Sequence, residues 1–237
     1  MRKRLKWLVP IIVLAALAGT FIVYTGDYYR ADDAALRALE SFGGVRVMRT
    51  GYGYRFDGPS EDAALVFYPG GKVEAEAYAP FLRRLAASGV DVCLVRMPFR
   101  LALFGIDSAD AVMARHDYPR WYVGGHSLGG AMAAAYATHH GDALAGVVLC
   151  AAYPIGALDQ HMTEICVYGS KDGVLDPKRL EASRAYAPET CFEHVIEGGN
   201  HAQFGNYGPQ RGDGAATISA EEQQRAAADY IAGHIAS

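Results

Sequence analysis

The alternation of short apolar runs with amphipathic segments is the feature that most constrains the fold of this chain. Apolar runs occupy residues 64–68, 90–95, 121–123, 145–151, 165–168 and 191–196, and segments with helical periodicity occupy residues 74–87, 108–115, 127–139, 177–187 and 219–235. Continuous apolar strands that alternate with helices are typical of a parallel sheet covered on both faces. The predicted fold class is therefore α/β, a three-layer α/β/α sandwich with a mostly parallel sheet.

Two further elements precede this pattern. Residues 32–42 have helical periodicity, and residues 45–56 alternate around two glycines, as expected for a hairpin at the edge of a sheet. Neither a repeat nor a linker interrupts residues 60–237, and the chain is long enough for one compact domain. We therefore expect an N-terminal helix and edge hairpin over residues 25–59 and an α/β core over residues 60–237.

An apolar stretch runs from Trp7 to Tyr24, directly after a basic flank over residues 1–6. At about 1.5 Å per residue, a helix over residues 7–24 would span roughly 27 Å, enough to cross the hydrocarbon core of a bilayer. Ala16-Leu17-Ala18 resembles a signal-peptidase site, but apolar residues continue beyond it. We expect a retained transmembrane anchor, with the basic flank in the cytoplasm and the remainder outside; cleavage would instead give a secreted protein.

Charge and cysteine usage exclude two kinds of site. Four of the 22 basic residues lie in the basic flank, so the rest of the chain is acidic, which argues against a nucleic-acid partner. Cys93, Cys150, Cys166 and Cys191 all lie in expected strands and contain no C-x-x-C pair for zinc. We expect them to pack as free apolar residues, with Cys166–Cys191 the one disulfide bridge to consider.

A glycine-flanked serine follows the apolar run at 121–123. Gly125-His126-Ser127-Leu128-Gly129 lies between this expected strand and an alanine-rich helix, which is the context of a nucleophile elbow. Side chains at the flanking positions would collide in such a tight turn, and the turn sets the hydroxyl at a helix N-terminus. Ser127 is the candidate nucleophile; the alternative is a glycine-rich turn with a helix-capping serine.

A serine hydroxyl needs a base to attack at neutral pH, and the base needs an acid to orient it. Asp172 follows the run at 165–168, at the sheet edge where Ser127 is expected. Asp176 is its rival, but Pro177 directly after it indicates a helix cap. Asp172 is the candidate orienting acid, and an ordinary turn aspartate is the alternative.

His201 lies in the loop after the last apolar run and is the candidate base. The other seven histidines fit this role less well, since they lie in connections, in an expected strand or in helices, and His126 is expected to point away from the elbow. The order Ser127, Asp172, His201 along the chain supports the choice.

Glycines also follow the first apolar run, in Pro69-Gly70-Gly71-Lys72. Backbone N–H groups in such a turn can approach an anion closely. The N–H of Leu128 paired with that of Gly71 would form an oxyanion hole, with Lys72 as the alternative to Gly71. A plain strand-to-helix turn remains the other interpretation.

With these motifs the chain resembles the α/β-hydrolase superfamily from about Asp62 to the carboxyl terminus. The resemblance lies in Gly125-His126-Ser127-Leu128-Gly129, Gly169-Ser170-Lys171-Asp172 and Gly199-Asn200-His201. Two further segments, 68–73 and 204–208, resemble a small, lidless bacterial branch that includes dienelactone-hydrolase-like relatives, although Ser127 replaces the cysteine of true dienelactone hydrolases. The resemblance implies acyl transfer to water with Ser127 as nucleophile, His201 as base and then acid, and Asp172 as its orienter, and implies neither a metal nor an organic cofactor.

The length of the connection between the fourth and fifth apolar runs indicates what size of substrate the site can take. Only residues 153–163 separate the run ending near Ala152 from the next, too few for a lid domain. An open cleft favours a small-molecule ester with a short or exposed acyl group, and residues 97–104 form either an apolar wall of that cleft or an ordinary crossover. Two other functions stay open: acyl transfer to an acceptor other than water, and a non-catalytic binding protein on a hydrolase scaffold.

Overall fold

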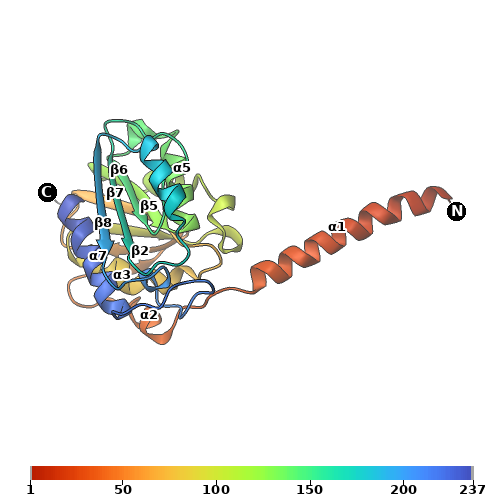
Figure 1. Ribbon diagram of the computed structural model, residues 1–237, viewed down its shortest axis with the longest axis horizontal. Helices are drawn as coiled ribbons and strands as arrows, with labels where there is room; N and C mark the ends of the chain where they lie inside the picture. Colours follow the sequence, from red (N-terminus) through yellow and green to blue (C-terminus); the bar gives the residue numbers. More distant parts are fainter. Residues whose placement is uncertain (1, 236–237) are drawn as a thin grey trace.

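The computed structural model describes the backbone of residues 2–235 and the side chains from residue 9 onward. It contains one eight-stranded sheet in the order β1-β2-β4-β3-β5-β6-β7-β8 (Figure 1). The strands are β1 (Arg46–Arg49), β2 (Gly53–Asp57), β3 (Ala63–Tyr68), β4 (Asp91–Val95), β5 (Arg120–His126), β6 (Gly146–Cys150), β7 (Thr163–Gly169) and β8 (Thr190–Ile196). Strands β3 to β8 are parallel to one another, whereas β1 and β2 pair antiparallel. The predicted mostly parallel sheet is confirmed.

The hairpin expected over residues 45–56 is present at one edge of the sheet. β2 pairs antiparallel with both β1 and β4, and Phe56 is fully buried opposite Val92. The turn between β1 and β2 lies at residues 50–52, as the two glycines in this region predicted. The hairpin therefore extends the sheet of the core instead of forming a separate unit.

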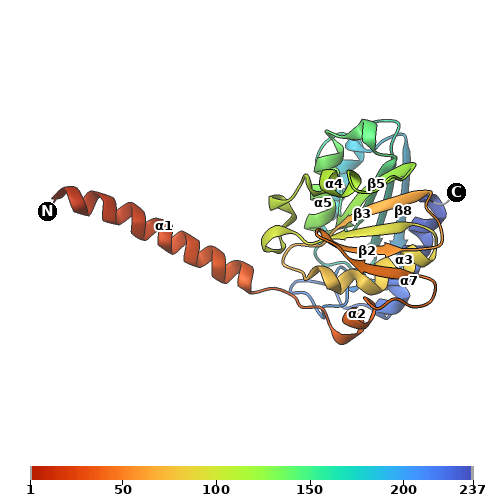
Figure 2. The ribbon, with the colours of Figure 1, turned by 180° about the vertical axis from the view of Figure 1, so that it is seen from behind.

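Helices cover both faces of the sheet, as the apolar strands require. α2 (Asp33–Arg37), α3 (Ala79–Ala87) and α7 (Ala220–Ile235) lie on one face, and α4 (Ser108–Met113), α5 (Leu128–Ala137) and α6 (Pro177–Ser183) lie on the other (Figures 1 and 2). All six residues of β3 are buried because Leu65 and Phe67 pack under α3 while Ala64 and Val66 pack under α5. The three-layer sandwich follows from this two-sided burial.

Element boundaries differ from the sequence prediction at three helices. The helix expected over residues 74–87 begins as a 3₁₀ turn, Ala75–Tyr78, and is α-helical only over α3. The helix expected over residues 32–42 shortens to α2, capped by Asp32, because the chain then turns back at Gly43-Gly44, where both residues have positive φ. The buried Arg83 side chain donates hydrogen bonds to the carbonyls of Glu40 and Phe42 and so holds this turn. The helix expected over residues 177–187 ends at Ser183 and continues as one 3₁₀ turn.

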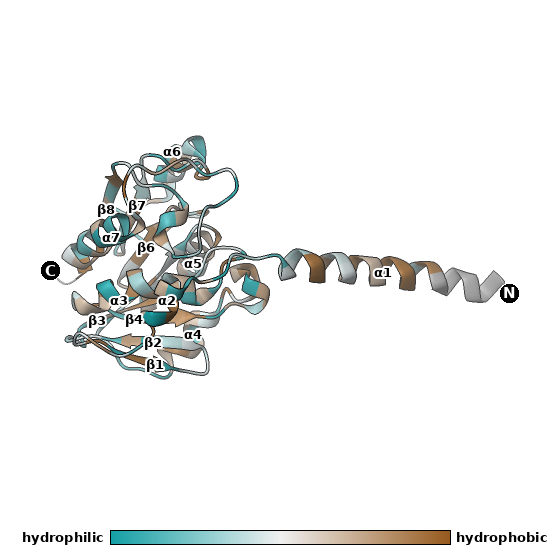
Figure 3. Cartoon of the chain, turned by 90° about the horizontal axis from the view of Figure 1, so that it is seen from below, coloured by the Kyte–Doolittle hydropathy of each residue, from teal (hydrophilic) through white to brown (hydrophobic). Residues whose placement is uncertain are grey.

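The N-terminal helix α1 (Arg2–Gly26) extends away from the globular part of the chain (Figures 1 and 2). Its window Val9–Gly26 has a mean hydropathy of 2.0, yet only 6% of this window is buried. Figure 3 shows the apolar residues along the helix and the polar chain that follows it. A core helix would be covered, so α1 is a candidate membrane span, and the same features also suit a signal sequence.

The four cysteines are free, and each lies in a strand as predicted. Cys93, Cys150 and Cys166 are buried, but Cys191 is exposed because β8 is an edge strand. The bridge between Cys166 and Cys191 is absent: Cys166 lies opposite Glu193, and Cys191 lies opposite Glu164. The two thiols are therefore offset along neighbouring strands.

Glu164 on β7 predicts a pH dependence of stability. Burial, with a smaller contribution from Glu193, raises the pKa of this carboxyl to about 7, and its Oε2 has no hydrogen-bond partner among the described residues. The folded chain therefore holds this proton more tightly than the unfolded chain, and stability falls as pH rises from about 4.5 to about 7. We expect Glu164→Gln to remove this slope and to stabilise the protein at pH 8 by about 1–3 kcal/mol.

Urea unfolding of the full chain in detergent at several pH values would measure this change. Glu61→Gln, at an exposed carboxyl, is the matched control and should leave the slope as it is. An unchanged slope in Glu164→Gln would contradict the assignment.

Candidate active site

The predicted site residues meet at the carboxyl edge of the parallel strands. Ser127 follows β5, Asp172 follows β7, His201 follows β8 and Gly71 follows β3. A cavity of about 260 Å³ opens at this edge, and its lining includes Ser127 and His201 together with Leu128, Ala131, Ala151, Ala152, Tyr153, Ile155, Val174, Leu175, Asp176 and Arg179. Residues 97–104 do not line this cavity, so they are not the apolar wall that the sequence left open.

The turn at Ser127 has the geometry of a strained elbow. Ser127 has φ 53° and ψ −124°, and α5 begins at the next residue. A Cβ at Gly125 would lie 2.4 Å from the Tyr68 carbonyl oxygen, and one at Gly129 would lie 2.2 Å from the same atom. These contacts are too short for any side chain, so glycine is required on both sides of the serine, as the motif predicted.

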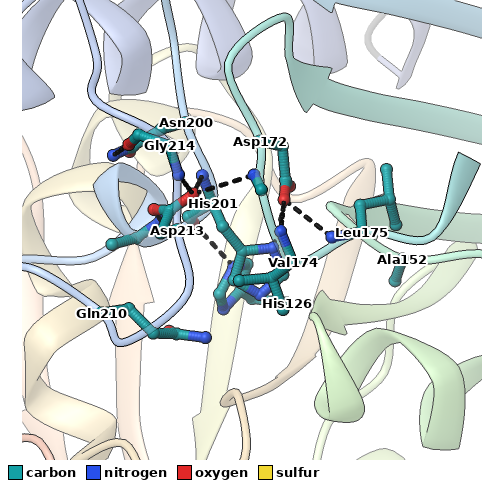
Figure 4. A network of polar contacts seen from close by, with 12 residues as sticks. His126, Ala152, Asp172, Val174, Leu175, Asn200, His201, Gln210, Asp213 and Gly214 are labelled. Atoms are coloured by element: carbon teal, nitrogen blue, oxygen red, sulfur yellow. Dashed lines mark hydrogen bonds and ion pairs between the residues drawn. The ribbon is translucent and has the colours of Figure 1, made fainter.

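Asp172 and His201 are joined by a hydrogen bond. The Nδ1 atom of His201 lies 2.8 Å from Oδ2 of Asp172, and both side chains are almost fully buried (Figure 4). The other carboxylate oxygen of Asp172 accepts the backbone N–H groups of Val174 and Leu175 at 2.8 Å each. Asp176 instead caps α6 through the N–H groups of Lys178 and Arg179, and of the two rival acids it is Asp172 that meets the histidine.

The second ring nitrogen of His201, Nε2, is buried and has no hydrogen-bond partner among the described residues. His201 and Ser127 nevertheless line the same cavity. The described side chains include no hydrogen bond between the Ser127 hydroxyl and this ring. Such contacts are often long before a substrate binds and tighten only in the complex.

Asp213 holds the two loops that carry Asp172 and His201. Its carboxylate accepts the N–H groups of His201 at 3.1 Å, Ala202 at 2.8 Å and Gly173 at 3.2 Å (Figure 4). Sequence analysis missed this residue because it lies in a polar loop among other turn residues, where an aspartate has no distinguishing pattern. Its role depends entirely on how three distant segments pack.

Gly71 and Leu128, whose N–H groups are expected to form the oxyanion hole, lie in contact with each other. A Cβ at Gly71 would lie 3.0 Å from Cδ2 of Leu128, and among the described residues the N–H groups of Gly71 and Leu128 donate to no acceptor. The N–H of Lys72, the alternative donor, is engaged with the Arg100 carbonyl at 2.8 Å. The geometry therefore favours Gly71 with Leu128.

A buried chain of polar groups beneath the elbow links residues 69–73 after β3, which we call the oxyanion loop for their expected role, to His201. The Gly70 N–H donates to the Tyr78 hydroxyl at 3.0 Å, and Nε2 of His126 donates to the His201 carbonyl at 3.0 Å. Because Nε2 carries the proton, Nδ1 of His126 accepts from the Tyr78 hydroxyl, 2.8 Å away. Burial, and to a smaller extent the neighbouring His201, holds the pKa of His126 well below its usual value. The ring is therefore neutral within these hydrogen bonds. Sequence analysis gave His126 no role, and nothing in its local pattern indicated one.

Backbone strain concentrates at the same edge. The described non-glycine residues with positive φ are Lys72, Phe99, Arg100, Ser127 and Ala151, and each follows one of the strands β3 to β6. Strained backbone of this kind costs about 1–3 kcal/mol per residue and persists where the surrounding structure holds it, commonly at functional sites. No group of three or more His, Cys, Asp or Glu side chains among the described residues is arranged to hold a metal ion.

A family model described as the alpha/beta hydrolase family matches residues 64–225, which is more than half of the chain. The chain belongs to this family. The match includes the elbow, the two strand-end loops that carry Asp172 and His201, and the first residues of α7. A comparison with the curated proteins finds no match.

Solved structures share the fold at low sequence identity. A membrane phospholipase A, described as a bacterial virulence factor, has a TM-score of 0.60 and 14% identity, with all of both chains covered. An esterase from Mycobacterium tuberculosis has a TM-score of 0.58 and 12% identity and covers 86% of this chain and 97% of its own. A monoacylglycerol lipase from Paleococcus ferrophilus has a TM-score of 0.57 and 15% identity and covers 80% of this chain and 99% of its own. At these identities the likeness concerns the fold.

Tyr78→Phe should test the polar chain beneath the elbow. The variant leaves the Gly70 N–H and His126 Nδ1 without their partner, and each unpaired buried group costs about 1–3 kcal/mol. We expect lower stability and, because the oxyanion loop loses a tether, a fall in kcat of about tenfold with a smaller change in KM.

Steady-state ester hydrolysis at a temperature where both proteins are folded would measure this effect. Tyr168→Phe, which removes a surface hydroxyl bonded to Glu193, is the matched control. A variant that loses stability but keeps its kcat would contradict the positioning role of Tyr78.

Proposed function

We propose that this chain is a serine ester hydrolase that works through an acyl-enzyme intermediate. The observation that carries the proposal is the buried hydrogen bond between Asp172 and His201, which leaves the free Nε2 of the ring beside the cavity that Ser127 lines. Membership in the alpha/beta hydrolase family supports the same conclusion.

The proposed reaction uses only groups of this chain and water. The Ser127 oxygen attacks the ester carbonyl carbon while Nε2 of His201 takes its proton, and the negative charge on the carbonyl oxygen is held by the N–H groups of Gly71 and Leu128. Asp172 stabilises the resulting imidazolium through Nδ1. The proton then passes to the leaving alcohol, an acyl ester remains on Ser127, and water activated by His201 releases the acid.

The shape of the site favours a small or exposed acyl group. Residues 151–162, which connect β6 to β7, contain neither a helix nor a strand, so no lid domain lies over the cavity. A cavity of about 260 Å³ is at the small end of ligand sites and accommodates an ester with a few carbons on either side.

We infer that α1 attaches the enzyme to a membrane. The proposed arrangement has residues 1–6 as a cytoplasmic flank, residues 7–24 as the anchor, residues 25–59 as the helix and edge hairpin, and residues 60–237 as an extracytoplasmic catalytic core. The uncovered apolar surface of α1 supports the anchor. Cleavage after Ala18 would instead release the remainder, and N-terminal sequencing of the mature protein distinguishes the two.

Labelling with a fluorophosphonate probe tests the nucleophile. We expect the wild-type chain to be labelled and Ser127→Ala to lose labelling, because the probe reacts with activated serine hydroxyls. Asp172→Asn should retain the fold but lower the turnover of an ester by about 10³- to 10⁴-fold, since the amide favours the wrong tautomer of His201.

Ser170→Ala, in the loop beside Asp172, is the control and should be labelled as strongly as the wild type. A wild-type chain that remains unlabelled would favour the binding-protein alternative. Product analysis in the presence of added alcohols would detect acyl transfer to an acceptor other than water.

A series of nitrophenyl esters of increasing chain length tests the open cavity. We expect kcat/KM to be highest for acetate and butyrate and to fall for long chains in monomeric solution, because the short cavity leaves the distal carbons in water. Initial rates below the critical micelle concentration of each ester measure this trend. Greater activity on the long chains would argue against the open-cavity interpretation.

A further inference from the structure

Three large apolar side chains are exposed within one short segment after β4. Phe99, Leu103 and Phe104 are 54%, 58% and 50% exposed, and none of them lines the catalytic cavity. Together with Phe21 of α1 they form a continuous surface, which we call the apolar platform. Leaving such a cluster in water is unfavourable, and clusters of this kind usually mark an interaction surface.

The platform is continuous with the candidate membrane span. The Phe21 ring contacts Phe99 and Phe104 edge-on, with centroid distances of 5.1 and 5.8 Å. Figures 1 and 2 show α1 leaving the globular part beside this segment. Phe21 is five residues from the end of the span Val9–Gly26, which corresponds to about 7–8 Å along the helix. A bilayer crossed by α1 therefore reaches the platform.

Aromatic and cationic side chains come together near the C-terminal end of α1, three to seven residues after Phe21. The Arg100 guanidinium lies 3.4 Å from the centre of the Tyr28 ring, and the Lys72 ammonium lies 4.5 Å from the centre of the Tyr24 ring. Apolar groups followed by tyrosines and cations match the order of acyl chains, interface and headgroups in a leaflet. Lys72 also pairs with the exposed Asp27 carboxylate at 3.2 Å, whereas the Arg100 guanidinium would attract anionic headgroups.

Backbone contacts attach the chain directly after α1 to the globular part. The Tyr29 N–H donates to the Lys72 carbonyl at 2.8 Å, and the Glu74 N–H donates back to the Tyr29 carbonyl at 2.9 Å. A carboxylate oxygen of Glu74 also accepts the Ala31 N–H at 2.9 Å. The chain directly after α1 is thus paired to the segment that follows β3, and the C-terminal end of α1 is attached next to the platform.

The platform also adjoins the catalytic cavity. The Lys72 N–H donates to the Arg100 carbonyl, and a Cβ at Gly71 would lie 3.8 Å from the Leu101 side chain. Gly71 in turn lies against Leu128, which lines the cavity. The segment that carries the platform is therefore packed directly on the proposed oxyanion hole.

We propose that the apolar platform docks on the lipid leaflet from which the C-terminal end of α1 emerges, and that the cavity takes its ester substrates from that leaflet. The second part rests on the proposed hydrolase function. Amphiphilic ester lipids fit this arrangement, because the short cavity holds the ester group and the first carbons while the remaining chain stays among the lipids. A large apolar pocket is then unnecessary.

Fluorescence quenching tests the docking directly, without catalysis. The full chain carrying Ser127→Ala, Cys191→Ser and Phe104→Cys, labelled with the fluorophore NBD, is reconstituted in phosphatidylcholine vesicles with about 30% phosphatidylglycerol. Nitroxide lipids with the spin label near the headgroup should quench the probe and its emission should shift to the blue. The same probe on Tyr186→Cys, away from the platform, should show neither effect.

Equal quenching at the two positions would overturn the proposal. A blue shift of the probe without nitroxide quenching would also overturn it, if the shift changed with the ratio of protein to lipid. A second copy of the chain, and not the leaflet, would then cover the platform. These outcomes do not depend on whether Ser127 is a nucleophile.

Hydrolysis measurements test the second part. We expect Phe99→Ser with Phe104→Ser to lower the hydrolysis of a long-chain monoacylglycerol in vesicles about tenfold relative to that of nitrophenyl butyrate in solution. Tyr186→Ser with Val195→Ser, which removes two exposed apolar side chains elsewhere, should leave this ratio unchanged. An equal loss of activity on both esters, or no loss on either, would overturn the proposal that the cavity takes its substrates from the leaflet. Failure of the wild type on both esters would instead contradict the proposed function, while the quenching result would still decide the docking.

Discussion

The close approach between the β5–α5 turn and the end of β3 is the constraint on which the site depends. Gly125 and Gly129 leave room for the Tyr68 carbonyl at distances that no side chain allows. This contact places Ser127 at the start of α5 and brings the oxyanion loop after β3 against Leu128. Because β3 and β5 are neighbours in the sheet, the proposed nucleophile and oxyanion donors come from adjacent strands.

Buried polar groups then connect this half of the site to the half that carries the base. Tyr78 and His126 link the oxyanion loop to the His201 carbonyl, and Asp213 binds the backbone of the His201 and Asp172 loops. These bonds lie in a low-dielectric interior, where a satisfied network is rigid and a broken one is costly. The side chains at the cavity are therefore positioned by groups that do not line it.

The proposed docking of the platform on a membrane complements an open, short cavity. A soluble esterase with a small pocket obtains little binding energy from a long acyl chain. The proposed docking would offer another solution, because the leaflet would hold the acyl chain while the cavity held the ester group. In this arrangement the presentation of the substrate at the lipid surface contributes to specificity together with the lining of the pocket.

The sequence by itself determined the layered α/β fold, the strand-end positions of Ser127, Asp172 and His201, and the apolar N-terminal helix. These features depend on local periodicity and on the rule that parallel strands end at one edge of a sheet. The pattern of residues along the chain is therefore enough to predict them. Only the tertiary structure decided that Asp172 and not Asp176 meets His201, that the Lys72 N–H is engaged elsewhere, and that Tyr78, His126 and Asp213 support the site. It also decided that Cys166 and Cys191 lie offset and that Phe99 and Phe104 face α1. Each of these depends on contacts between segments that are far apart in the chain, and such contacts leave no periodic signal in the residues that make them.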